Sequence, residues 1–430
     1  MLDEPAAPPT PDKFHPALLL GELGPGLVTG AADDDPSGIA TYSQAGAAYG
    51  FGLLWTMVLT FPLMAAIQLA CARIGRVTGL GLAGNMARQF PRWAVSLLVG
   101  LLLIANTINI GADLAAMGAS VELLTGFGSH IWTVGFALLT MSLQLFVPYH
   151  RYAHFLKWLT LALLAYVAVL MAVRIDWSAV AVGLFVPRVD GAPAVTVIVA
   201  LFGTTISPYL FFWQSSQEVE EIRDHPQSHP LIQSPSEAPA ELGRIRFDTI
   251  VGMAASNLVA LAIMIATAAT LNASGHTNIT TAADAAEALR PIAGNFAFFL
   301  FALGIIGTGL LAVPVLAGSS AFAVSEARGW RSGLEFRPFE ARGFYAVIAL
   351  STLTGVVIDW SSLDPIRALF WSAVLNGVVA VPLMAALMII VSSRKAMGKF
   401  TAGLPLRLIG WAATVAMTVA VAAMALTSFG

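Results

Sequence analysis

The chain repeats apolar segments of about 20 residues, the length of helix that crosses the ~30 Å hydrocarbon core of a bilayer. It is 57% hydrophobic and 11% charged, whereas a soluble domain carries roughly 25% charge. The alternating strands of a membrane β-barrel do not occur in the sequence. The pattern therefore predicts an all-α polytopic membrane protein. Eleven membrane-spanning segments are expected, near 18–48, 51–74, 93–119, 130–148, 154–174, 193–218, 246–271, 293–325, 342–359, 365–392 and 404–428.

The basic residues indicate which ends of these segments face the cytoplasm. If the N-terminus is inside, 18 of the 22 Lys and Arg residues fall on the cytoplasmic side and four outside. This predicts a multi-pass protein of the plasma membrane, the inner membrane of a bacterial cell, with the N-terminus in and the C-terminus out. Residues 1–17 are expected to form a disordered cytoplasmic tail, because they are Pro-rich and polar and have no signal-peptide pattern. An outer loop is expected at 175–192 and a cytoplasmic loop at 219–243.

Three consecutive carboxylates interrupt the first segment at Asp33, Asp34 and Asp35, directly before Pro36. A charge at this depth costs about 2.5 kcal/mol or more, so we expect it to have a function. Asp35 is the favoured cation ligand, since a residue before proline is pushed out of helical geometry. Asp34 is the second candidate for a ligand. Otherwise Asp33 and Asp34 cap a helix, pair with a basic group or line the access path.

A second interruption lies in the sixth segment, at Gly203 to Tyr209, again with a proline in mid-span. Broken helices at membrane depth persist only where they line a cavity or are buried in protein. Breaks in the first and sixth segments divide the chain into five-helix repeats at 18–174 and 193–392, with an eleventh helix at 404–428. This is an inverted repeat with substrate at the midplane between the breaks. The alternative is two unrelated proline kinks.

Oxygen atoms at the two breaks are suited to a cation, because a carboxylate beside freed carbonyls is a hard-oxygen site. We expect the Ser207 hydroxyl and the Thr204 backbone carbonyl to act with Asp35. Helix capping and back-bonding are the alternative roles for both. Gln214 reaches the cavity if it faces inward and is otherwise solvated.

Polar residues of the third segment lie on one helical face, at Asn106, Asn109 and Asp113. An intramembrane Asp suggests a proton carrier, an ion path or a partner for Arg. The alternative is a polar network that holds helices together. Asn376 in the tenth segment either lines the path or serves packing.

Motifs of several other protein classes are missing from the sequence. There is no Walker loop of an ATP-driven pump, and neither HExxH nor GxSxG of an intramembrane hydrolase. We therefore expect a transporter rather than an enzyme. No cofactor and no nucleic-acid partner are expected; the partners are an inorganic ion as substrate and the bilayer, with the chain acting as a monomer.

Several motifs resemble those of the NRAMP family of divalent-metal transporters, whose first helix carries Asp-Pro-Gly-Asn. Here the first helix has Asp35-Pro36-Ser37-Gly38 after Gly24-Pro25-Gly26. Similarity continues at Ala112 to Ala115, at Gly304 to Gly309 and at Pro314 to Ser320. The resemblance implies the leucine-transporter fold and a metal site between helices 1 and 6.

The chain also departs from this family's pattern. Gly38 replaces the Asn, and Ser207-Pro208-Tyr209 replaces Met-Pro-His, so the thioether that favours soft transition metals is missing. Tyr209 does not titrate near neutral pH as a His does. Ala116 stands where the family has Glu, and the ninth helix has no mid-span Arg. The proton route implied by the resemblance is therefore largely lost.

These features favour alternating-access transport of a divalent cation with weak or no proton coupling. Mg²⁺ is preferred, because it keeps several waters and needs one or two carboxylates, and Mn²⁺ is the second candidate. An alternative keeps the fold but moves a small organic solute or anion, such as an amino acid or bicarbonate, coupled to Na⁺ or H⁺. A third alternative is a receptor that has lost transport.

The expected metal ligands are Asp35, Ser207 and Thr204. The residues expected along the pathway or next to the ligands are Asp33, Asp34, Ser37, Gly38, Asn106, Asn109, Asp113, Tyr209, Gln214 and Asn376.

Overall fold

The computed structural model describes residues 25–147, 161–225, 227–360 and 364–429. Within these ranges the regular elements are helices, which confirms the all-α class. The helices are α2 (Pro25–Asp33), α3 (Pro36–Tyr49), α4 (Trp55–Thr78), α5 (Leu82–Gln89), α6 (Arg92–Thr125), α7 (Ser129–Phe146), α9 (Leu164–Ala172), α10 (Trp177–Phe185), α11 (Ala192–Thr205), α12 (Pro208–Asp224), α13 (Ala238–Thr270), α14 (Ala282–Ala286), α15 (Arg290–Ala293), α16 (Ala297–Arg328), α17 (Arg342–Ile358), α18 (Pro365–Ser392), α19 (Arg394–Met397) and α20 (Leu404–Phe429).

Eight helical segments of the described chain are long and apolar enough to cross a membrane. They are α4, α6, α7, α13, α16, α18, α20 and the pair α11–α12. The other three predicted spans correspond to shorter helices: the pair α2–α3, α9 and α17. The predicted tail at 1–17 lies outside the described residues, as do 18–24 of the first predicted span and 154–160 of the fifth.

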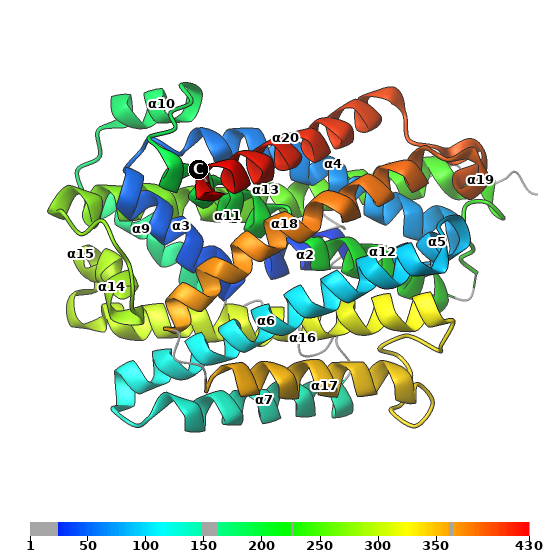
Figure 1. The fold of residues 1–430 in the computed structure, drawn as a ribbon, viewed down its shortest axis with the longest axis horizontal. Coiled ribbons are helices and arrows are strands. Elements are labelled where there is room, and N and C mark those ends of the chain that lie inside the picture. The colour runs from blue at the N-terminus through cyan, green and yellow to red at the C-terminus, as the bar shows by residue number, and fades with distance from the viewer. Residues whose placement is uncertain (1–24, 148–160, 226, 361–363, 430) are drawn as a thin grey trace, which may run out of the picture.

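The two broken helices lie side by side in the middle of the bundle (Figure 1). Helix α13 packs along both α2 and α3, and α12 packs against α2. Helices α6 and α16 run alongside one another, and α7 and α17 cover the outer side of α6. Helix α18 crosses α6 and α11. Both breaks are thus enclosed by protein, as backbone freed at membrane depth requires.

Short helices mark the two ends of the bundle. Helices α5 and α19 lie at one end, and α10, α14 and α15 at the other (Figure 1). Helix α10 lies within the predicted outer loop 175–192.

The connection predicted at 219–243 is shorter in the structure, because α12 continues to Asp224 and α13 begins at Ala238. Ion pairs neutralise the charged side chains at these two helix ends. Arg244 Nη2 is 2.7 Å from the fully buried Glu218, and Arg76 Nη2 is 3.1 Å from Glu241.

Glycine permits the closest approach between the second break and its neighbour. A Cβ added to Gly203, near the end of α11, would overlap the carbonyl oxygen of Ala373 and the amide nitrogen of Gly377 on α18. Because both obstacles are backbone atoms, no side-chain rotation relieves the overlap.

We expect Gly203→Ala to destabilise the protein by about 1–3 kcal/mol through overpacking. The measurement is the thermal unfolding midpoint of the purified chain in detergent. Gly100→Ala is the control, since a Cβ there meets no atom within 4 Å. Equal midpoints for Gly203→Ala and the wild type would contradict the close packing of α11 on α18.

Candidate functional site

The first break lies at Asp34 and Asp35, between α2 and α3. Asp35 is extended, with φ −75° and ψ 170°, and Pro36 starts α3. The Asp35 carboxylate caps this helix: its Oδ1 accepts hydrogen bonds from Gly38 N at 2.8 Å and from Ser37 Oγ at 2.6 Å. The local sequence explains this geometry. The residue before a proline avoids helical dihedral angles, and Asp is a favoured residue at the N-cap position, which precedes the first helical residue.

The second break repeats this arrangement with a different residue. Ser207 is extended, with φ −72° and ψ 124°, and Pro208 starts α12. The Ser207 hydroxyl does not cap the helix but donates to the Thr204 carbonyl at 2.7 Å, while the Gly203 carbonyl lies 3.3 Å away. Ser207 therefore adopts the back-bonded arrangement that the sequence left open as its alternative, and the Thr204 carbonyl accepts this bond.

Gly38 lies where the two breaks meet. A Cβ on Gly38 would be 3.2 Å from Thr204 Oγ1 and 3.6 Å from Asp35 Oδ1, so these two oxygens flank the glycine. The sequence pointed to the Thr204 carbonyl, whereas the structure directs the side-chain hydroxyl towards Gly38. Tyr42 of α3 is also fully buried beside Gly38, and its ring lies 3.2 Å from the position of that added Cβ.

Tyr209 joins the two broken helices directly. Its hydroxyl donates to the Ala32 carbonyl at 2.9 Å, which satisfies an acceptor left free at the end of α2. Gln214, on the same helix, is fully buried, and its Oε1 accepts a hydrogen bond from Thr29. Gln214 is therefore not solvated, and its partner Thr29 lies on α2.

Helix α6 connects the first break to α18. Asn109 Nδ2 donates to Asp35 Oδ2 at 3.0 Å, and Asn109 Oδ1 accepts from Ser372 Oγ at 2.6 Å. Asn376 lies one turn beyond Ser372 and is buried, with both polar side-chain atoms unpaired in the described chain.

The remaining polar residues of α6 have different roles. Asn106 Nδ2 donates to the Leu316 carbonyl at 3.1 Å and lies 2.9–3.0 Å from the hydroxyls of Ser319 and Ser320, so it holds α6 to α16. Asp113 is fully buried, and neither carboxylate oxygen has a hydrogen-bond partner within the described residues. It lies one helical turn beyond Asn109, on the face that contacts Asp35.

Asp33 and Asp34 are held by a residue that the sequence did not identify. Ser256 of α13 lies with its Oγ 2.7 Å from Asp33 Oδ2 and 3.0 Å from Asp34 Oδ1. Neither acid has a basic partner among the ion pairs of the described chain, so that predicted alternative is not what the structure shows. One hydroxyl donates a single hydrogen bond, so the two carboxylates compete for it.

The sequence also missed Thr29 and Ser372. Single Ser and Thr residues in apolar helices are common, and only their distant partners reveal what they do. The sequence held one signal for Ser372: it lies four residues before Asn376, so the two polar residues share one face of their helix.

The carboxylates at the first break do not form a three-ligand metal site. No group of three His, Cys, Asp or Glu side chains in the described ranges is placed to hold a metal ion. A cation bound between the breaks would therefore meet the single carboxylate of Asp35 and neutral oxygens from Thr204 and Ser207.

Comparison with known proteins places this chain. The family model "Natural resistance-associated macrophage protein-like" (Nramp) matches residues 26–427. The chain belongs to the Nramp family. Membership confirms the resemblance seen in the sequence and the prediction of a multi-pass membrane transporter rather than an enzyme.

Two curated relatives are both named divalent metal cation transporter MntH. The protein of Pectobacterium carotovorum (strain PC1) is 29% identical over 310 residues, 69% of this chain and 70% of the relative. The protein of Klebsiella pneumoniae is 26% identical over 401 residues, 92% of this chain and 91% of the relative.

Solved structures confirm the fold. The manganese transporter of Eremococcus coleocola superimposes with a TM-score of 0.77 at 17% identity, covering 97% of this chain and 90% of that one. The inward-facing structure of Mhp1 has a TM-score of 0.56 at 13% identity, covering 95% of this chain and 91% of that one.

We expect Ser256→Ala to cost about 1–3 kcal/mol in unfolding free energy, because it removes the donor shared by two buried carboxylates. Denaturant unfolding in detergent measures this. Ser351→Ala is a matched control, since the buried Ser351 hydroxyl has no hydrogen-bond partner within the described chain. If the two variants lose the same stability, Ser256 does not hold the acids.

Proposed function

We propose that this Nramp-family chain transports a divalent cation by alternating access, with Mg²⁺ as the preferred substrate and Mn²⁺ as the second. The cation binds between the two broken helices, at Asp35, Thr204 and Ser207. The observation that carries the proposal is the arrangement at Gly38, where the Asp35 carboxylate and the Thr204 hydroxyl flank a residue without a side chain.

The donor atoms support a hard and partly hydrated ion. Asp35 Oδ1 accepts hydrogen bonds from Ser37 and Gly38, and Oδ2 accepts one from Asn109, so the carboxylate is held in place between neutral donors. Ser207 supplies oxygen in the position where the family pattern has sulfur. Mg²⁺ retains several waters and uses one or two carboxylates, which matches one carboxylate among neutral oxygens.

We further propose that Asp33 and Asp34 attract the cation towards the site, and that Asp113 and Asn376 line its path beyond Asp35. Asp113 and Asn376 are buried with unpaired polar atoms in the described chain, on helices that Asn109 and Ser372 join to the first break. Gln214 and Tyr209 hold the half-helices together, and Asn106 holds α6 to α16.

Weak or absent proton coupling remains part of the proposal. Tyr209 donates to a backbone carbonyl, a role that requires no change of its protonation near neutral pH. An anionic substrate is disfavoured, because the carboxylates of Asp33, Asp34 and Asp35 lie at the break without a basic partner among the ion pairs of the described chain.

In proteoliposomes we expect Mg²⁺ influx without acidification of the lumen, followed with an enclosed Mg²⁺ dye and an enclosed pH dye. Asp35→Asn should lower the influx about tenfold or more, because it removes the charge while its side-chain oxygen still caps α3. Asp190→Ala, at an exposed site, is the control and should keep wild-type influx. Uptake of Mn²⁺ alone, or influx that acidifies the lumen, would contradict the proposal.

Ser207→Met should shift selectivity from Mg²⁺ towards Mn²⁺ by several-fold, because a thioether favours transition metals. Competition between the two ions in the same liposomes measures the shift. Ser207→Ala separates the loss of the hydroxyl from the gain of sulfur. An unchanged Mn²⁺ to Mg²⁺ ratio in Ser207→Met would exclude this residue from the ion site.

A further inference from the structure

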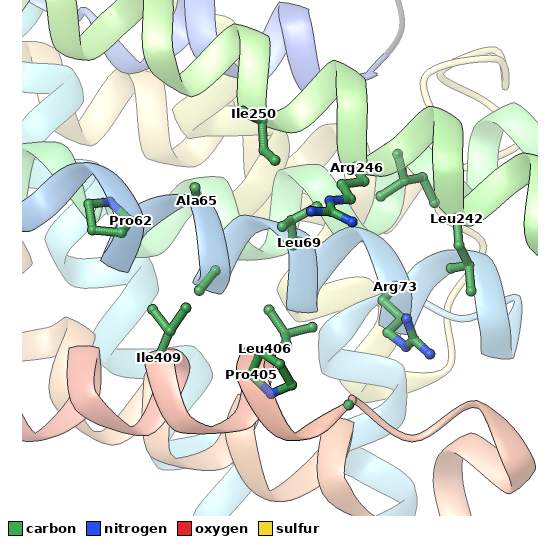
Figure 2. Close-up of a pocket in the computed structure, with 13 residues that line it drawn as sticks. Pro62, Ala65, Leu69, Arg73, Leu242, Arg246, Ile250, Pro405, Leu406 and Ile409 are labelled. Atoms are coloured by element: carbon green, nitrogen blue, oxygen red, sulfur yellow. The ribbon is translucent and has the colours of Figure 1, made fainter. Parts of the chain in front are cut away.

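A groove of about 450 Å³ lies between α4, α13 and α20 (Figure 2), and no residue of the two breaks lines it. Helix α4 forms its floor, and α13 and α20 form its walls. Helices α13 and α20 both pack along α4. Ala65 and Ala66 of α4 have small side chains, which leave space between these two helices.

The groove is apolar along most of its length. Its lining contains two arginines and no acidic residue, and the other lining residues are aliphatic, proline or glycine. Pro62 and Arg73 lie at its two ends on α4, 11 residues apart. That separation is roughly 16 Å at the helical rise, about half the ~30 Å thickness of a bilayer core. The groove therefore has the length of one leaflet.

Both arginines lie towards the same end of the groove, while Pro62 and Ile409 lie at the other (Figure 2). Arg73 donates from Nε to the Phe400 carbonyl at 2.9 Å and from Nη2 to the Thr401 carbonyl at 3.3 Å. These bonds fix its guanidinium and leave further N–H groups available. Arg246 is exposed and forms no ion pair within the described chain.

The geometry points to a binding site for an anionic phospholipid, with an acyl chain along α4 and the phosphate on Arg73 and Arg246. Guanidinium groups form paired hydrogen bonds with phosphate oxygens, and basic pockets between membrane helices bind anionic lipid headgroups. The arginines lie at the end of α4 that leads to α5, the end that the distribution of basic residues assigns to the cytoplasm. The lipid thus belongs to the cytoplasmic leaflet.

The bound lipid lies against the helix that anchors the first break. Arg246 and Ile250 face the groove, whereas Asp248, between them on the other side of α13, accepts a hydrogen bond from Gly26 N at 2.7 Å. One face of α13 thus contacts lipid and the other holds α2.

The test is lipid binding by the full chain in detergent, measured by native mass spectrometry with phosphatidylglycerol and with phosphatidylcholine of the same acyl chains. We expect one phosphatidylglycerol to bind more tightly than phosphatidylcholine. Replacing both arginines, as Arg73→Gln with Arg246→Gln, should weaken phosphatidylglycerol binding about tenfold or more and abolish the preference. If the double variant does not fold, Arg246→Gln alone should reduce the preference about threefold, since this side chain is exposed.

The control variant combines Arg88→Gln with Arg92→Gln, which removes the same charge from exposed positions outside the groove and should bind like the wild type. Leu69→Trp should weaken binding of both lipids, because it fills the floor of the groove. Equal losses in the control and the groove variant would overturn the proposal. So would displacement of phosphatidylglycerol by millimolar inorganic phosphate together with no effect of Leu69→Trp, since the site would then recognise only an anion.

Discussion

The structure depends on satisfying the backbone groups that two breaks release at membrane depth. In a bilayer core no water compensates a free carbonyl or N–H, so the protein must supply the partners. The Tyr209 hydroxyl satisfies the Ala32 carbonyl, the Asp35 carboxylate caps Gly38 N, and Ser207 bonds the Thr204 carbonyl. The polar residues of the two broken helices are thus the parts that make the breaks possible.

This requirement also gives the proposed site its chemistry. Several of the groups that stabilise the breaks are side-chain oxygen atoms, and one of them, Asp35 Oδ1, lies beside Gly38 together with the Thr204 hydroxyl. Asn109 then ties Asp35 to Ser372, so that α3, α6 and α18 share one buried network. A change at Asp35 would therefore affect the packing of three helices.

Local sequence was sufficient where a residue acts on its own segment. The Asp directly before a proline predicted the break at Asp35, whereas capping had been assigned to Asp33 or Asp34 and the structure gives it to Asp35. Local sequence was insufficient where a side chain bonds to a residue far along the chain. Asn106 and Asn109 share one face and one residue type, yet one holds α6 to α16 and the other holds the Asp35 carboxylate. Periodicity locates a face but does not name what packs against it.

The sequence by itself determined the all-helical membrane class, the two broken helices and the family, because apolar length, mid-span prolines and short motifs are local properties. Only the tertiary structure decided that Ser256 holds Asp33 and Asp34. It also decided that the Thr204 hydroxyl, and not only its carbonyl, lies near the first break, beside Gly38. It also created the groove between α13 and α20. Each of these features joins residues that are distant in sequence, and their positions are set by how the helices pack.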